Sequence, residues 1–474
     1  MLKLPKVISV VCGVIFMLAA CKSNSGNRAR QQVPITDSIT ETPAVTEGPV
    51  KPATYKVFIE NSGSMNGYVN VNSAFKNAVM GYITDLKTKD VAGQLNIYYI
   101  NKQVCPQKEN ALPDEIKNFF QNLNPVSFNN SGCGTSTSYI PEIIRHVVDS
   151  IKTDVNILIS DFIFSDADGT SPAYLEAAQH TLKLYLAEAL KSQDFATVIV
   201  KLHSNFDGKY YIESKRPAVV DFTGRPISRP YYMVIFGKPE RLRPMLDKID
   251  FTQYNGYENA CYLFPPGKQK INAKIVLNDK IGNFKVAFPA TNLVVNHAST
   301  GKDRNDDSDK FQFSLAANLG YLKTDKQYLL DVSQYQVPDN YRLVSVKETG
   351  PLAGPGLEGY THLFTLQTTA LQPNQEVYIR LKPKLPDWVA ASSTNDDSRP
   401  ADSLQQRQTF GFAYLIKGMA GAYTNHYADA AQFALQVKVS KDEAGKSNSR
   451  GGFPWWIVGA IVLVLGGIFI MKRR

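Results

Sequence analysis

A carboxylate and two hydroxyl groups alternate in the segment Glu60-Asn61-Ser62-Gly63-Ser64, which directly follows a short apolar stretch. Oxygen atoms at alternating positions of one turn can converge on a hard divalent cation. Mg²⁺ prefers octahedral oxygen ligation with few carboxylates and several water molecules. Glu60, Ser62 and Ser64 are therefore the first candidates for a metal site, with Mg²⁺ or Mn²⁺ as the ion.

The elements that must position these residues alternate between strands and helices over residues 54–250. Apolar runs predict strands at 55–59, 95–100, 155–159, 196–202 and 231–236. Helical spacing of apolar residues predicts helices between them, the first of them capped by Ser73. This alternation predicts an α/β domain with a parallel sheet covered on both faces. Ligands of such sheets bind beyond the carboxyl ends of the strands, which is where the segment 60–64 lies.

The segment 60–64 resembles the start of the metal-ion-dependent adhesion site (MIDAS) of the von Willebrand factor A family, which has the motif Asp-x-Ser-x-Ser. The resemblance covers residues 55–250 and implies a doubly wound, mainly parallel sheet. It also implies two further ligands. Thr135, in Gly134-Thr135-Ser136-Thr137-Ser138, matches the family's threonine, and Asp161, after the strand 155–159, matches its second acidic ligand.

One departure from the family concerns Glu60, which stands where the family has Asp. Its side chain is one methylene longer, so its carboxylate must fold back or bind the metal directly rather than through water. A fold of the same type without metal stays open as an alternative. In that case Ser62 and Ser64 cap the next helix and Thr135 hydrogen-bonds a loop.

The cysteines add a second expectation near the same loop. Cys133 lies two residues before Thr135, and Cys105 follows the neighbouring strand. A disulfide between them would stiffen the rim of the site, while two free, partly buried thiols are the alternative. Cys261 would be left as a free thiol.

The second half of the chain has a different pattern. Apolar-rich runs of four to eight residues recur between Gly- and Pro-containing turns, without a long helical stripe. They predict an all-β, sandwich-like domain over residues 265–440. The runs lie at 274–277, 284–288, 328–332, 342–346, 377–381, 410–415 and 433–439.

Both ends of the chain predict membrane attachment. Residues 1–21 have a basic start, an apolar run and Leu18-Ala19-Ala20-Cys21, which resembles a bacterial lipobox and implies lipidation of Cys21. Residues 453–471 predict a transmembrane helix and 472–474 a basic cytoplasmic tail. The polar segments 22–53 and 441–452 read as flexible linkers. A C-terminal sorting signal that is later removed is the alternative for the last segment.

The composition and charge of the chain exclude some classes of function. The 474 residues are 43% hydrophobic and 20% charged, as in globular proteins. Lys3, Lys6 and residues 472–474 carry more than half of the net charge of +9, so the charge reflects membrane topology and we expect no nucleic-acid binding. Membrane attachment predicts an extracytoplasmic protein of the bacterial cell envelope, anchored in the inner membrane.

The resemblance implies recognition rather than catalysis. Ser62, Ser64 and Thr135 would hold the ion, Glu60 and Asp161 would supply charge, and an acidic side chain of a partner protein would complete the open coordination position. A metal-independent scaffold of an envelope or secretion machine is the alternative. An envelope hydrolase has less support, because the sequence contains no Gly-x-Ser-x-Gly elbow and no matching His/Asp order.

Overall fold

The computed structural model describes residues 53–441 except for 71–72, 135–137, 153, 167–170, 216, 266–270, 304–305, 321, 323–325, 351–355, 428–430 and 432. The signal segment 1–21 with Cys21, the linker up to residue 52, Thr135, the linker from residue 442 and the segment 453–474 lie outside this part. No helix within the described residues is long and apolar enough to cross a membrane.

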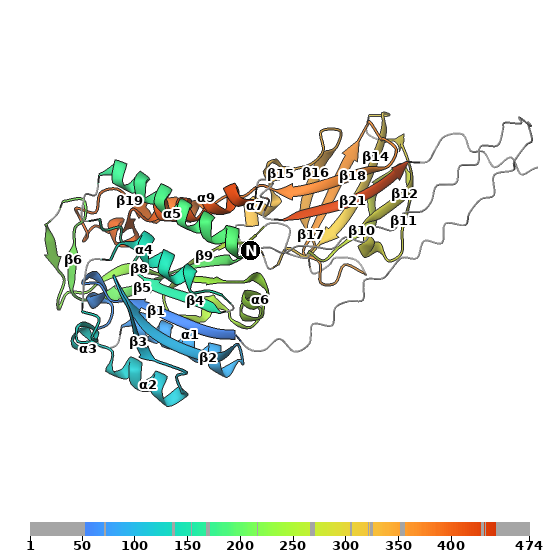
Figure 1. The fold of residues 1–474 in the computed structure, drawn as a ribbon. Coiled ribbons are helices and arrows are strands. Elements are labelled where there is room, and N and C mark those ends of the chain that lie inside the picture. Colours follow the sequence, from blue (N-terminus) through green and yellow to red (C-terminus); the bar gives the residue numbers. More distant parts are fainter. Residues whose placement is uncertain are drawn as a thin grey trace, which may run out of the picture. The chain divides into compact units, whose positions relative to one another are not determined.

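The first folded part, here called the α/β body, contains a seven-stranded sheet among the described residues, with strand order β3-β2-β1-β4-β8-β5-β9 (Figure 1). The strands are β1 (Ala53–Glu60), β2 (Ala92–Ile100), β3 (Val104–Lys108), β4 (Val155–Ser160), β5 (Ala196–Phe206), β8 (Ile227–Gly237) and β9 (Tyr257–Leu263). The expected strands are thus present, together with β3 and β9, and the body extends past the predicted boundary at residue 250.

The sheet is mixed, whereas a mainly parallel sheet was expected. The strands β1, β2 and β4 pair in parallel, as the sequence predicts. The strand β8, however, pairs antiparallel with both β4 and β5, and β9 pairs antiparallel with β5. The reason is the connection between β5 and β8. It contains the short hairpin of β6 (Lys209–Tyr211) and β7 (Val219–Asp221) and no crossover helix, so β8 runs antiparallel to β5.

Helices lie on both faces of this sheet, with α4, α5 and α9 on one side and α1 and α2 on the other (Figure 1). The Ser73 cap is confirmed, because its Oγ accepts a hydrogen bond from the backbone N of Lys76 at 3.2 Å. The helices of the first 250 residues are α1 (Ala74–Thr88), α2 (Pro113–Asn122), α3 (Pro125–Asn129), α4 (Ile140–Asp149), α5 (Pro172–Ser192) and α6 (Pro239–Lys248).

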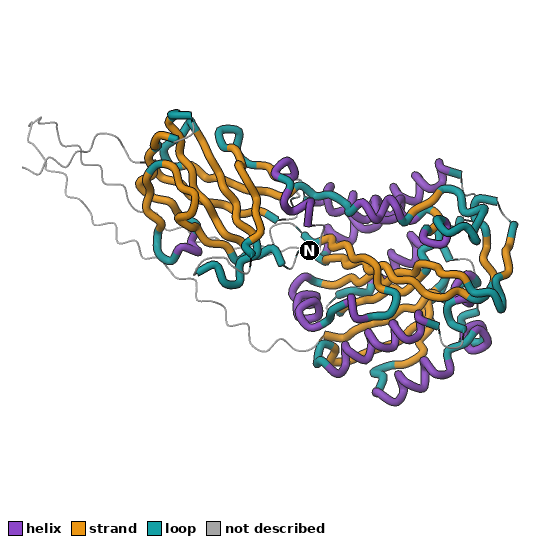
Figure 2. Tube along the Cα trace, turned by 180° about the vertical axis from the view of Figure 1, so that it is seen from behind, coloured by secondary structure: helices purple, strands orange, loops and turns teal. Residues whose placement is uncertain are grey.

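The second folded part, here called the sandwich, has two five-stranded sheets among the described residues and one shared apolar core (Figure 2). One sheet contains β10 (Ala273–Ile281), β13 (Gly301–Lys302), β14 (Asp309–Ala317), β16 (Arg342–Glu348) and β17 (His362–Thr368). The other contains β11 (Asn283–Val286), β12 (Val294–Ser299), β15 (Tyr335–Gln336), β18 (Gln375–Leu381) and β21 (Ala434–Lys441).

Two of the apolar runs predicted as strands are wrong. Residues 328–332 fall in the helix α7 (Lys326–Leu330) and the turn that follows it. Residues 410–415 enter the helix α9 (Phe412–His426), which begins after Gly411 in the left-handed region. The buried positions of α9 recur every three or four residues, a spacing that becomes visible only over the whole helix.

The segment 387–426 belongs to the α/β body although it lies between two strands of the sandwich. Phe412, Ile416 and Met419 of α9 are buried in the core of the body, and α9 lies beside α5 (Figure 1). Gly418 allows this close approach, because a Cβ there would lie 2.6 Å from the carbonyl oxygen of Gln179. The other elements of the segment are α8 (Asp387–Ala391), β19 (Ser393–Thr394) and β20 (Thr409–Phe410).

Candidate functional site

Polar residues gather at the edge of the sheet where the parallel strands end. Glu60 is the last residue of β1, Asn101 follows β2, and Asp161 follows β4. Glu60 is in register with Ile100, and Ile59 with Ile159, so the three ends lie at the same level. Parallel strands thereby bring together side chains that are far apart in the sequence.

Glu60 and Asp161 are both buried, with 2% and 1% of their surfaces exposed. Burial, together with the negative charge of Asp161, raises the pKa of Glu60 to about 7, and the hydroxyls of Ser160, Ser62 and Ser138 limit this rise. Burial likewise raises the pKa of Asp161, against the lowering effect of Ser64 and the backbone N–H of Ile163. Two like charges are therefore held together in a poorly solvated place.

The two serines of the first turn lie directly at this pair. Their Oγ atoms are 2.9 Å apart, and Ser64 begins the short 3₁₀ helix η1 (Ser64–Gly67). Two neighbouring ligands of an octahedral Mg²⁺ at about 2.05 Å from the ion are about 2.9 Å apart. The two hydroxyls are hydrogen-bonded to each other at 2.9 Å, which is also the spacing of two adjacent ligands of one such ion.

Two buried oxygen atoms of the cluster have no hydrogen-bond partner of good geometry among the described residues. They are Oδ2 of Asp161 and Oγ of Ser138. The other carboxylate oxygen of Asp161 accepts from the backbone N of Ile163 at 3.1 Å, and Glu60 accepts from Ser160 Oγ. Buried polar atoms are nearly always paired in folded proteins, so these two need an explanation.

The chain is strained directly after Asp161. Phe162 has φ = 55°, in the left-handed region that bulky residues rarely adopt. Its backbone N donates to Ser160 Oγ at 2.8 Å, and its ring packs edge-on against Tyr232 and Phe412. Such conformations cost about 1–3 kcal/mol each and cluster at functional sites.

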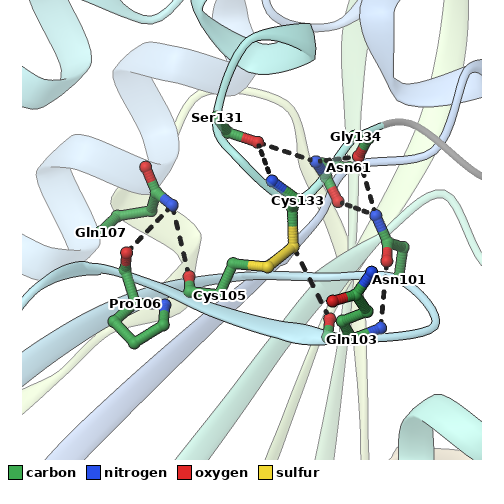
Figure 3. The surroundings of a disulfide bond; sticks show 9 residues. All are labelled: Asn61, Asn101, Gln103, Cys105, Pro106, Gln107, Ser131, Cys133 and Gly134. Atoms are coloured by element: carbon green, nitrogen blue, oxygen red, sulfur yellow. Dashed lines mark hydrogen bonds between the residues drawn. A yellow bond between two sulfur atoms is a disulfide. The ribbon is translucent and has the colours of Figure 1, made fainter.

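A loop at residues 131–134 is fastened to the ends of β1 and β2 (Figure 3). The side-chain amides of Asn61 and Asn101 donate to the carbonyl of Gly134 at 3.0 and 2.9 Å, and Asn101 also donates to Asn61 Oδ1 at 2.8 Å. In the structure Cys105 of β3 and Cys133 form a disulfide with Cα atoms 5.8 Å apart. These contacts hold Gly134 beside the candidate site.

A tyrosine of the β6–β7 hairpin lies over the serine turn. A Cβ added to Gly63 would lie 3.4 Å from Tyr211 Oη, and 40% of Tyr211 is exposed. The same hairpin contributes Tyr210, which is buried and contacts the guanidinium group of Arg229. The hairpin thus forms one wall of the site, between the serine turn and the interior.

Four of the five predicted ligands come together: Glu60, Ser62, Ser64 and Asp161. Thr135 lies outside the described residues, although Gly134 and Ser138 on either side of that gap both belong to the cluster. Among the described residues, no group of three or more His, Cys, Asp or Glu side chains could hold a metal ion. The cluster has only two carboxylates, and hydroxyl groups make up the rest of its oxygen donors.

Other residues of the site were not predicted from the sequence. Asn61 and Asn101 could have been found, since both are polar residues directly after buried strands. Arg229 lies near the start of β8, whose sequence is like that of any other strand, and its neighbour Tyr210 carries no motif. Arg229 and Tyr210 reach the site because β8 runs antiparallel to β4 and because the β6–β7 hairpin precedes β8. No local sequence pattern indicates either feature.

No protein-family model matches the chain, and neither a curated protein nor a solved structure matches it.

Proposed function

We propose that the protein is a non-enzymatic recognition protein of the bacterial cell envelope that binds a divalent cation, Mg²⁺ or Mn²⁺, at the edge of the α/β sheet. The cation is held by Glu60, Ser62, Ser64 and Asp161, with Thr135 as a further ligand, as in the adhesion site of the von Willebrand factor A family. An acidic side chain of a partner protein completes the coordination.

The observation that carries the proposal is the pair of buried carboxylates, at which Asp161 Oδ2 and Ser138 Oγ have no hydrogen-bond partner of good geometry in the described part of the chain. A cation would offset the repulsion between Glu60 and Asp161 and would give Asp161 Oδ2 a partner. The donors are carboxylate and hydroxyl oxygens, which suit Mg²⁺ and Mn²⁺ rather than softer metals. Glu60 in place of Asp is compatible with this, because its carboxylate is folded back toward Ser160.

Recognition of an acidic partner follows from the chemistry of such a site. Hydroxyl ligands are neutral and leave the cation electron-poor, so a carboxylate is the group that it would attract most strongly. The disulfide Cys105–Cys133 supports an oxidising, extracytoplasmic location, which agrees with the lipidation expected at Cys21 and the span expected at 453–471.

The test is a calorimetric titration of the full-length chain with Mn²⁺ and Mg²⁺, beside a variant that combines Ser62→Ala with Ser64→Ala. We expect the double variant to lose at least about tenfold in affinity, the lower limit seen when groups around a metal site are removed. Ser314→Ala is the matched control, because Ser314 is also buried and also pairs with a hydroxyl, that of Thr365 at 3.0 Å. Equal heats for wild type and double variant would refute the proposal.

A metal-independent scaffold remains the second candidate, and one observation favours it. Arg229 is a buried cation whose charge acts on Asp161, so the protein itself offsets part of the negative charge. A chain that binds its partner equally well in excess EDTA, and that binds no Mn²⁺, would support the scaffold instead.

A further inference from the structure

Arg229, near the start of β8, is one of the largest fully buried side chains among the described residues. Its Nη1 donates to the carbonyl of Gln405 at 2.7 Å, and its Nη2 donates to Tyr210 Oη at 3.3 Å. The guanidinium carbon also lies 4.5 Å from the centre of the Tyr210 ring. A guanidinium group keeps its charge at any accessible pH, so this is a permanent positive charge inside the protein.

The position of Arg229 follows from the strand register. Ser160, one residue before Asp161, is opposite Tyr232 of β8, and Ser204 of β5 is opposite Arg229. Since β8 runs antiparallel to β4, the residues before Tyr232 extend toward the carboxyl end of β4, where the candidate ligands lie. Arg229 contacts Tyr210, and the next residue of the same hairpin, Tyr211, lies against the serine turn at Gly63.

A second carboxylate, that of Asp397, is connected to the arginine through Tyr210. Tyr210 Oη donates to Asp397 Oδ2 at 2.9 Å, and the backbone N–H groups of Glu213 and Ser214 each donate to Asp397 at 2.9 Å. Asp397 and Gln405 both come from the segment 387–426. Tyr210 therefore links the arginine to a carboxylate that arrives from much later in the chain.

We propose that Arg229 sets the balance between the two ligands of the site: it weakens the binding of the divalent cation and strengthens the binding of a carboxylate to the cation-loaded site. This inference rests on the proposed function. Without the arginine, the two positive charges of the ion would only balance Glu60 and Asp161, and a further carboxylate would add an uncompensated negative charge. Arg229 adds one positive charge near the loaded site, which favours an incoming carboxylate, and the negative charge of Asp397 offsets part of this effect.

The sign of both effects is independent of Asp397. A positive charge near the site repels the cation and attracts an anion whatever other fixed charges are present, because Coulomb energies add. Opposite changes in the two affinities are therefore the signature of Arg229, whereas a residue that merely holds the site in shape would weaken both.

The experiment uses the full-length chain and two probes, Mn²⁺ and acetate. The enhancement of water-proton relaxation by bound Mn²⁺ gives the Mn²⁺ affinity, and its fall on addition of acetate gives the affinity of the loaded site for a carboxylate. For Arg229→Gln we expect Mn²⁺ to bind about tenfold more tightly and acetate about tenfold more weakly, from the effect of one charge at the effective dielectric of such a site. Arg229→Lys keeps the charge and should restore both affinities.

Asp397→Asn provides a second variant in case Arg229→Gln does not fold. Asparagine keeps one oxygen acceptor, which can serve Tyr210 Oη and the backbone N of Glu213, and loss of the negative charge leaves Arg229 less compensated. Mn²⁺ should then bind more weakly and acetate more tightly, the reverse of Arg229→Gln.

Affinities that fall together in Arg229→Gln, or that do not change, would overturn the role of Arg229 and leave the proposed metal site intact. Absence of Mn²⁺ binding by the wild-type chain would refute the proposed function, and the role of Arg229 with it.

Discussion

The α/β body and the sandwich both bury polar side chains, and they treat them differently. In the sandwich, Ser314 pairs with Thr365 at 3.0 Å and Gln367 donates to Gln312 at 2.8 Å. These groups are neutral, lie opposite each other on β14 and β17, and satisfy one another. Such pairs provide the hydrogen bonds that buried polar groups require in a folded protein.

At the edge of the body, the buried polar residues satisfy one another only in part. Glu60 and Asp161 are like charges, and Asp161 Oδ2 and Ser138 Oγ have no good partner among the described residues. Phe162 adds backbone strain at the same place. Folding alone does not explain an arrangement that opposes stability at several neighbouring positions, and the ligand binding proposed above would explain it. The sandwich is expected to determine stability, and the edge of the body is expected to determine binding.

The largest expected effect tests the sandwich. Phe313 is buried in its core, and Phe313→Ala should lower the free energy of unfolding of the sandwich by about 3–5 kcal/mol through lost burial and the cavity left behind. Hydrogen exchange of peptides from β14 and β17 measures the loss. Mn²⁺ affinity measured under native conditions should not change, and a change would contradict the division between the two regions.

A second, smaller effect concerns pH. Burial lowers the pKa of His203 to about 4, with Lys201, Arg229 and Arg407 acting in the same direction and Glu258 opposing them. Because the unfolded chain has the higher pKa, near 6.5, stability is complete above that value and is lost as the pH falls toward 4. The loss should reach about 2 kcal/mol at pH 5. Urea unfolding at pH 7 and pH 5 measures it.

The matched variants separate this histidine from general acid effects. His203→Gln should remove this part of the pH dependence, while His180→Gln should not, because His180 is exposed on α5. Burial also lowers the pKa of His362 in the sandwich, so acid should weaken both regions in the same direction. An identical pH dependence in wild type and His203→Gln would show that His203 is not the group responsible.

Much of the site's frame could be predicted from the sequence, because it depends on local patterns. The apolar runs before Glu60 and Asp161 predict buried strands, and polar residues directly after such strands predict a site at their ends. Ser73 predicts the start of α1 for the same reason, since a cap acts over three residues.

The remaining features could not be predicted because they depend on contacts between distant segments. α9 was predicted as a strand because six apolar-rich residues at 410–415 fit either element, and its core partner α5 lies more than 200 residues earlier in the chain. The sheet is mixed because β8 pairs antiparallel with β4 and β5. The same antiparallel direction of β8 brings Arg229 to the site. Asp397 and Gln405 are placed by the docking of 387–426 on the body, which has no local signature.

The smallest expected effect is the change in the free energy of unfolding when one buried carboxylate is neutralised. It distinguishes the two regions most clearly, because its sign should be opposite in the α/β body and in the sandwich. At pH 7.5 and in EDTA, Glu60→Gln should raise the free energy of unfolding by about 1 kcal/mol, since it removes a buried charge that Asp161 repels and keeps an acceptor for Ser160. Asp303→Asn in the sandwich should lower it by about 1 kcal/mol, because Asp303 is paired with Lys310 at 2.8 Å. Urea unfolding measures both.

Mn²⁺ should bind normally to Asp303→Asn and more weakly to Glu60→Gln, so that the stabilised variant is the one that loses binding. If Glu60→Gln were instead destabilised, its carboxylate would be a structural group like that of Asp303, and the case for a binding site at this edge would fail.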